Sequence, residues 1–272
     1  MGGRTQIGSS TVARASALIV AAGRGTRLGS ALPKAFVDLA GEPMVAWSIR
    51  ALQAAGVQEI VLALPPDGEL PQRFIAHERD GGARRDAARL VLPDAVRTVR
   101  GGAERSHSVR AALAASSGDP VIVHDAARPL LTPEFVAAAL DRFDRSVRGN
   151  ATLCSAARPT EAGADATPLA AAVIAAPVVD TIKRSVDGQH VSETLPRSEL
   201  WAVQTPQVFC RAWLERALDQ PDEALATATD DASLVEALGG TVALVPAPGP
   251  NLKVTTPHDR TVAELLLAAR PD

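Results

Sequence analysis

The chain has 272 residues, a length that fits one large α/β domain or two small ones. It carries 28 Lys and Arg against 31 Asp and Glu and only 3% aromatic residues, so it lacks the basic surface and the stacking side chains of a nucleic-acid-binding protein. The two cysteines, Cys154 and Cys210, have no metal-ligand spacing, and we expect both to be reduced core residues of a cytoplasmic protein.

The N-terminal residues 1–16 are small and polar and contain no apolar signal-peptide core, so we expect a disordered tail. The apolar run of residues 17–22 comes next. It is too short to cross a membrane, and it predicts a buried strand. We therefore expect a single domain over residues 17–272 and no membrane segment.

A loop that combines glycines with cations follows this strand. Glycine allows tight turns and close approach of the backbone to a ligand, and exposed N–H groups beside cations favour phosphate binding. The residues concerned are Gly23, Arg24, Gly25, Arg27, Gly29 and Lys34. No Gly-Lys-Ser/Thr follows, and Leu28 stands where a dinucleotide fingerprint needs its third glycine. Taken alone, the loop is equally compatible with an ordinary turn whose cations are solvated.

Strands and helices alternate along the rest of the chain, which predicts a three-layer α/β fold with a mainly parallel sheet. The predicted strands cover residues 60–64, 96–99, 121–123, 151–156, 171–176, 242–245 and 252–254. The predicted helices cover residues 43–56, 104–116 and 132–146, then a segment ending near Leu218, one capped by Thr229, and one from Pro257 onward. Residues 67–94 are polar, and we expect a surface helix and loops there.

An arm is expected over residues 178–206. Asp187-Gly188 is a hairpin-turn signal, and residues 191–197 would form the return strand. Thr181 is polar for a core strand, and Arg197 is out of place unless it reaches a partner.

Two segments place polar side chains where α/β proteins bind ligands. His124-Asp-Ala-Ala-Arg128 ends a predicted strand, so Asp125 could bind Mg²⁺ and Arg128 a phosphate. A strand-end cap with an ion pair is the alternative. We interpret His124 as structural or as a support for the residues of the site, since nothing nearby indicates a metal pair. The second glycine turn, Gly101-Gly102, opens a helix in which Ser108 could donate a hydrogen bond; a plain strand–turn–helix is the alternative.

Seven motifs, in order over residues 17–268, resemble the 2-C-methyl-D-erythritol 4-phosphate cytidylyltransferase family. They are Ala21-Ala-Gly-Arg-Gly-Thr-Arg27 with Pro33-Lys34, Gly101-Gly102 with Arg105 and Ser108, His124-Asp-Ala-Ala-Arg-Pro129, Asp180-Thr-Ile-Lys-Arg184, Gln204-Thr-Pro-Gln207, Thr229-Asp-Asp-Ala-Ser233 and Asn251-Leu-Lys-Val-Thr255. The resemblance implies a Rossmann-like nucleotidyltransferase fold with a protruding β-arm, and a homodimer formed through that arm. It also implies Mg²⁺ as cofactor and a reaction that joins CTP to the sugar-alcohol phosphate and releases pyrophosphate.

The resemblance also implies roles for individual residues. Arg27, Lys34 and Lys253 match the catalytic cations. The positions that match cytidine-nucleotide contacts are Ala21, Ala22, Gly23, Gly102 and Ser108. The positions assigned to the sugar phosphate are Asp125, which also lies near the metal, Arg128, Thr181, Arg197 and Thr205. Three departures from the family are Ala103 in place of a frequent Asp and the long segments 67–94 and 152–175.

Two other functions remain open at this stage. A ribitol 5-phosphate cytidylyltransferase shares most of these motifs, although Asp180-Thr-Ile-Lys-Arg184 favours methylerythritol phosphate. A non-catalytic nucleotide-sensing module could use the same fold, but the presence of Arg27, Lys34, Asp125 and Lys253 argues against it.

Overall fold

The computed structural model describes residues 9–23, 28, 32–66, 75–77, 90–148 and 169–270. Its centre is a seven-stranded sheet in the order β13-β9-β12-β8-β1-β4-β7. The strands are β1 (Ser16–Val20), β4 (Glu59–Leu64), β7 (Val96–Arg100), β8 (Val121–Asp125), β9 (Leu169–Pro177), β12 (Trp201–Phe209) and β13 (Thr241–Pro246). Only β12 runs antiparallel to its neighbours, so the predicted mainly parallel α/β sheet is confirmed.

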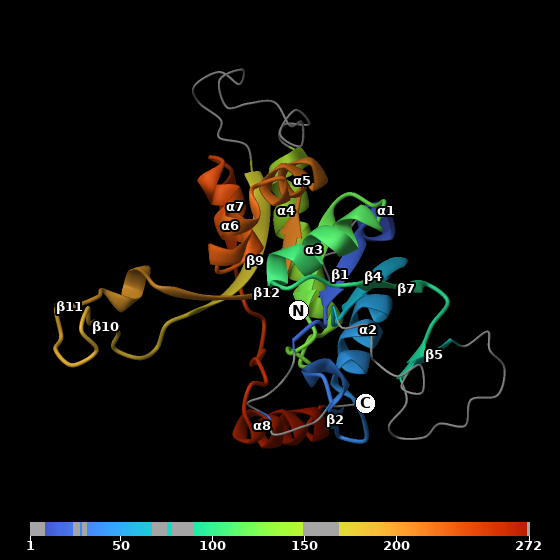
Figure 1. The fold of residues 1–272 in the computed structure, drawn as a ribbon, viewed down its shortest axis with the longest axis horizontal. Coiled ribbons are helices and arrows are strands. Elements are labelled where there is room, and N and C mark those ends of the chain that lie inside the picture. Colours follow the sequence, from blue (N-terminus) through green and yellow to red (C-terminus); the bar gives the residue numbers. More distant parts are fainter. Residues whose placement is uncertain are drawn as a thin grey trace, which may run out of the picture.

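Helices pack on the sheet in two groups, which gives the predicted three layers (Figure 1). One group is formed by α4 (Pro133–Arg148), which packs on β9, β12 and β13, with α1 (Ser9–Arg14) and α2 (Met44–Ala54) against it. The other group contains α3 (Arg105–Ala114), α5 (Arg211–Leu218), α6 (Asp222–Thr227) and α7 (Asp231–Ala237). No described helix has the length and apolar character needed to span a membrane.

Buried apolar side chains explain why the strands form where the sequence predicts them. Every residue from Ala17 to Ile19 and from Val121 to Val123 is fully buried, as expected for central strands covered on both sides. At the carboxyl ends of these strands the chain turns into loops, so β1 and β8 deliver residues 21–23 and Asp125 to one edge of the sheet.

Part of the predicted disordered tail forms regular structure. Residues 9–14 form α1, Val12 is buried, and Ser16 begins β1, so the expectation of disorder is wrong for residues 9–16. The physical reason is that this short helix packs against α4. Residues 1–8 lie outside the described part of the chain.

A short hairpin projects from the body of the protein within residues 178–200, the region where the sequence predicts an arm. Its ladder is limited to β10 (Lys183–Arg184) and β11 (Glu193–Thr194), which pair antiparallel and project away from the sheet in Figure 1. The predicted return strand 191–197 is therefore mostly irregular and ends in a 3-10 turn, Arg197–Glu199. The arm stops at residue 200, because Trp201 already pairs with Pro177 in the main sheet.

Residues 252–254 form no strand, although the sequence predicts one. The Val254 N–H donates to the carbonyl of Ala127, at 2.8 Å, rather than joining a ladder. The Val254 side chain enters a small second core with Leu39, Met44 and α8 (Pro257–Ala268). Lys253 therefore lies on an extended loop, which is held by this hydrogen bond and by the packing of Val254, and not inside a strand pair.

The remaining differences are local. Asp230, not Thr229, caps α7, because its carboxylate accepts from the Ser233 N–H. Helix α6 was not predicted. Within residues 67–94 the structure describes the parallel strands β5 (Ile75–His77) and β6 (Leu90–Leu92) where we expected a surface helix. The predicted strand 151–156 and Cys154 lie outside the described residues, whereas Cys210 is buried as predicted.

Candidate active site

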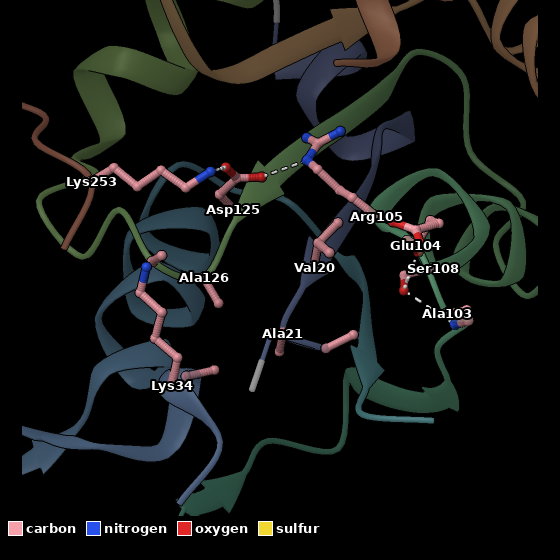
Figure 2. Close-up of a pocket in the computed structure, with 15 residues that line it drawn as sticks. Val20, Ala21, Lys34, Ala103, Glu104, Arg105, Ser108, Asp125, Ala126 and Lys253 are labelled. Atoms are coloured by element: carbon pink, nitrogen blue, oxygen red, sulfur yellow. Dashed lines mark hydrogen bonds and ion pairs between the residues drawn. The ribbon is translucent and has the colours of Figure 1, made fainter. Parts of the chain in front are cut away.

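A cavity of about 220 Å³ opens at the carboxyl ends of β1 and β8 (Figure 2). Its lining brings together residues that the sequence analysis assigned to a nucleotide and to catalysis. These residues are Ala21, Ala22, Gly23, Lys34, Gly102, Ser108, Asp125 and Lys253. Residues from four separate stretches of the chain thus meet at one place, which supports their assignment to one site.

The wall formed by the second glycine turn needs glycine for steric reasons. A Cβ on Gly101 would lie 2.6 Å from the carbonyl oxygen of Leu64, and one on Gly102 would lie 2.3 Å from the Cβ of His107. The Gly102 N–H donates to Ser108 Oγ at 3.1 Å, and that hydroxyl donates to the carbonyl of Glu104 at 3.2 Å. The turn is therefore packed tightly against the start of α3, at the edge of the cavity.

Lys34 reaches the cavity from the opposite side. It begins a 3-10 turn, Lys34–Phe36, and its backbone N–H donates to the carbonyl of Gly23 at 3.1 Å. Ala35 and Phe36 are buried and fix this turn in the core. The Lys34 side chain is thereby held beside the backbone that follows β1. Arg27, the other predicted catalytic cation from this loop, lies outside the described residues.

The charged centre of the site is the Asp125 carboxylate. Arg105 Nε donates to Oδ1 at 3.0 Å and Lys253 Nζ donates to Oδ2 at 2.7 Å. Figure 2 shows the two cations approaching Asp125 from opposite sides. Burial disfavours the charged carboxylate, but Arg105 and Lys253 outweigh this effect and hold the pKa of Asp125 well below its usual range. Asp125 is thus ionised at neutral pH.

A second, larger cavity of about 590 Å³ adjoins the first. It contains the predicted substrate residues Arg128 and Thr205, and it shares Arg105, Asp125 and Lys253 with the first cavity. The ion cluster therefore stands where the two cavities meet. Such an arrangement can hold two anionic molecules with their reacting ends near the two cations, Arg105 and Lys253, of this cluster.

Arg128 and Thr205 are held by buried or partly buried hydrogen bonds. Arg128 Nη1 donates to the carbonyl of Asn251 at 2.7 Å, and Asn251 Nδ2 donates to the carbonyl of Thr205 at 2.8 Å. The N–H of Asp125 donates to Thr205 Oγ1 at 3.0 Å. The loop that carries Lys253 is thus tied to β12 and to the β8–α4 loop, which fixes the floor of the second cavity.

His124 is structural, as predicted, and its protonation state follows from its contacts. Its Nε2 lies 3.3 Å from the carbonyl of Arg128, and its Nδ1 lies 3.1 Å from Thr205 Oγ1. Because a carbonyl only accepts, Nε2 carries the proton and Nδ1 accepts from the Thr205 hydroxyl. Burial lowers the pKa of His124 to about 4, so the ring is neutral at physiological pH.

The two predicted substrate residues on the arm lie apart from both cavities. Thr181 and Arg197 line neither of them, and Arg197 Nη1 donates to the carbonyl of Val179 at 3.0 Å within the arm itself. Both residues are partly or fully exposed on an element that extends away from the body of the protein (Figure 1).

Asp125 does not fit the predicted role of a ligand to a resident magnesium ion. Each of its oxygens already accepts a hydrogen bond from a cation, so a divalent ion bound there would lie next to two positive charges. Within the described ranges, no group of three or more histidine, cysteine or acidic side chains could hold a metal.

The sequence analysis gave no role to two residues of the cluster. Arg105 appeared in a motif without an assigned role, and Asp231, which is fully buried, was not singled out. Arg105 Nη1 donates to Asp231 Oδ2. The available signal was a cation at the first position of a helix, where the helix dipole disfavours positive charge, together with two consecutive aspartates at the start of another helix.

Comparison with known proteins identifies relatives over nearly the whole chain. The family model for 2-C-methyl-D-erythritol 4-phosphate cytidylyltransferase matches residues 15–158 and 155–269. Enzymes of that name from Ralstonia nicotianae and Deinococcus radiodurans are each 39% identical; the matches cover 94% and 93% of this chain and 92% and 89% of the relatives. The crystal structure of the enzyme of that name from Thermus thermophilus is 30% identical with a TM-score of 0.66, over 93% of this chain and 99% of that chain.

Proposed function

Because the chain belongs to the 2-C-methyl-D-erythritol 4-phosphate cytidylyltransferase family and is thus a nucleotidyltransferase, we propose that its two adjoining cavities bind the two substrates of that reaction. CTP would occupy the first cavity, and 2-C-methyl-D-erythritol 4-phosphate the second. The observation that carries this proposal is the shared cluster of Arg105, Asp125 and Lys253 where the cavities meet.

The reaction needs positive charge more than it needs a general base. A phosphate oxygen of the sugar alcohol, already an anion, attacks the α-phosphorus of CTP; a new P–O bond forms, and the bond to pyrophosphate breaks. Two polyanions must meet, and further charge develops on the leaving group. Fixed cations that face this charge stabilise the transition state. Lys34 and Lys253 line the first cavity, and we propose this role for both. We assign the same role to Arg27 by its family motif.

The nucleotide side of the proposal rests on the glycine turns. Ala21, Ala22 and Gly23 offer backbone close to the cavity, and Gly102 lines the same cavity. Ser108 adds a hydroxyl at the same wall. We propose that Mg²⁺ enters with the phosphates of CTP as part of the substrate, since the side chains around Asp125 do not favour a resident ion.

Arg128 and Thr205 are our candidates for holding the sugar phosphate. Arg128 supplies a half-buried positive charge in the second cavity. The Thr205 hydroxyl donates its hydrogen bond to His124 Nδ1, so it can accept a hydrogen bond from a substrate hydroxyl rather than donate one to a phosphate. Methylerythritol phosphate carries both a phosphate and hydroxyl groups, as this pair requires.

Thr181 and Arg197 would complete the site from a second subunit. Neither reaches the cavities of its own chain, and the arm that carries them exposes Val179, Val186 and Val191. Exposed apolar side chains on a projecting hairpin favour burial against another molecule. We therefore propose a homodimer formed through the arm. We also propose a cytoplasmic location, consistent with the buried thiol of Cys210.

Complementation between inactive subunits tests the shared site. In a dimer of Lys34→Ala with Arg197→Ala, one site carries both substitutions and the other carries neither. Mixing the two variants after reversible dissociation should restore roughly a quarter of parental activity at random pairing. Mixtures that stay inactive, although mixed dimers form, would show that Arg197 serves its own subunit or none.

Pyrophosphate release tests the proposed function itself. The protein is assayed with CTP and Mg²⁺ and with methylerythritol phosphate, ribitol 5-phosphate or no acceptor. We expect release only with methylerythritol phosphate. Release only with ribitol 5-phosphate would retain the fold and the chemistry but overturn the substrate. CTP binding without release in any mixture would instead support a nucleotide-sensing module.

A further inference from the structure

The guanidinium of Arg105 is held between two carboxylates that come from different parts of the fold. Its Nε donates to Asp125 Oδ1 at 3.0 Å, and its Nη1 donates to Asp231 Oδ2. The Asp125 side chain is 10% exposed and that of Asp231 is 0% exposed, whereas Arg105 lines both cavities. The guanidinium is therefore fixed by two hydrogen bonds in its plane, and the group lies at the boundary between the two cavities.

The helix that carries Arg105 disfavours a cation at this position. Arg105 is the first residue of α3, where the helix dipole is positive, and burial adds a desolvation cost. The carboxyl groups of Asp125 and Asp231, which both contact the guanidinium, offset these costs. The fold thus compensates for an unfavourable position of a cation with two buried partners. This compensation indicates that the cation has a role at this position and that its orientation matters for that role.

Asp231 has no other evident use for its charge. Capping of α7 is done by Asp230, whose carboxylate accepts from the Ser233 N–H at 2.9 Å. The second oxygen of Asp231, Oδ1, is buried and has no hydrogen-bond partner among the described residues. Asp231 also lines neither cavity. Its ion pair with Arg105 is thus the interaction that accounts for a charged side chain at this buried site.

We infer that Asp231 is a positioning residue for the proposed cytidylyl transfer, acting by fixing the guanidinium of Arg105. The series runs from Asp231 through Arg105 to Asp125 and on to Lys253, and each member holds the next by a direct contact. Asp231 thereby helps to set where Lys253 stands between the two substrates. The inference rests on the proposed function and adds a residue to it that touches neither substrate.

The effect of Asp231→Asn can be predicted separately for kcat and KM. The amide keeps the volume but removes the charge that fixes one edge of Arg105, so the cluster loses alignment and kcat falls, by roughly 10- to 100-fold. The cluster also becomes more positive, so attraction for the polyanionic nucleotide is not weakened. We therefore expect the KM for CTP to stay level or fall.

A double-mutant cycle tests the inference against a merely structural ion pair. The kcat is measured per CTP-binding site, counted by calorimetric titration, for the parent, Asp231→Asn, Arg105→Gln and the double variant. If Asp231 acts through Arg105, the double variant should match Arg105→Gln within about twofold, because removing the second partner of a contact that is already lost has no further effect. The control is Asp222→Asn, which removes the exposed partner of Arg110 on the same helix and should leave kcat within about twofold of the parent.

Three results would overturn the inference. One is a parental kcat per binding site in Asp231→Asn, which would leave Asp231 a purely structural residue. Another is a full additional loss in the double variant, which would show that Asp231 acts independently of Arg105. The third is an equal loss in the Asp222→Asn control. A parent protein that releases no pyrophosphate would instead overturn the proposed function on which the inference rests.

Discussion

The buried ring of His124 should make the stability of the protein depend on pH in a specific way. His124 is fully buried, and its pKa falls from 6.5 to about 4. The main cause is burial; Asp125 favours the charged ring, and Arg128 opposes it. Between these two values the unfolded chain binds a proton that the folded protein excludes. Stability from this group is therefore present above pH 6.5 and is lost as the pH falls toward 4.

The magnitude follows from the gap between the two pKa values. At about 1.4 kcal/mol for each pH unit, the full loss has an upper limit of roughly 3 kcal/mol. Between pH 7.5 and pH 5 the expected loss from His124 is about 2 kcal/mol. That range lies above the ordinary pKa values of most carboxylates, so the contribution of His124 is large relative to theirs.

Urea unfolding at the two pH values, at one fixed protein concentration, measures this contribution. In the His124→Gln variant the loss of unfolding free energy between pH 7.5 and pH 5 should be about 2 kcal/mol smaller than in the parent. Ser48→Ala is the matched control. It removes the hydroxyl that lies 3.1 Å from His124 Nε2 but keeps the buried ring, so it should keep the pH dependence. An equal pH dependence in the parent and His124→Gln would refute the reasoning.

Two further substitutions probe the packing around the site. Gly101→Ala places a Cβ 2.6 Å from the carbonyl oxygen of Leu64 and 2.8 Å from Ser108 Oγ. It should cost about 1–3 kcal/mol and raise the KM for CTP, whereas Gly249→Ala, which meets no atom within 4 Å, should change neither quantity. Trp213→Ala empties a fully buried position and should lower the unfolding free energy by about 3–5 kcal/mol in a urea titration. The exposed Leu265→Ala should have little effect on it, and equal losses in both variants would contradict this account of the core.

The parts of the fold that the sequence predicted are those in which local signals agree. The runs 17–22 and 121–123 are apolar, short and bounded by proline, glycine or polar residues, and the central strands β1 and β8 form there. The sequence analysis did not predict strand β12, because its residues lack a continuous strand pattern. Thr205 and Pro206 interrupt the apolar pattern, and the pairing with β9 shifts register between Val203 and Gln207.

The segment 252–254 shows the opposite error. Leu252 and Val254 alternate with Lys253 as in a half-buried strand. Their burial comes instead from packing beside α8, and one hydrogen bond to the β8–α4 loop replaces a ladder. Periodicity reports which side chains are buried; it does not report the backbone partner, which depends on distant parts of the chain.

Some residues of the site could be predicted from the sequence, and others could not. Motifs located the glycine turns, Lys34, Asp125 and Lys253, because each motif is contiguous in the sequence. The Arg105–Asp231 pair joins residues 126 positions apart, and neither residue carries a local signal strong enough to indicate its partner. Only the fold, which places the start of α3 next to the start of α7, reveals that contact.

The central claim is that fixed cations around the first cavity perform the transfer. Its most direct test is the kcat for pyrophosphate release by Lys34→Ala, with methylerythritol phosphate and saturating CTP. We expect a loss of about 10³-fold or more, equivalent to at least roughly 4 kcal/mol of transition-state stabilisation, with an unchanged thermal melting profile. Arg145→Ala, which removes a 70% exposed cation on α4, should leave kcat unchanged. Turnover near the parental rate by folded Lys34→Ala would contradict the account.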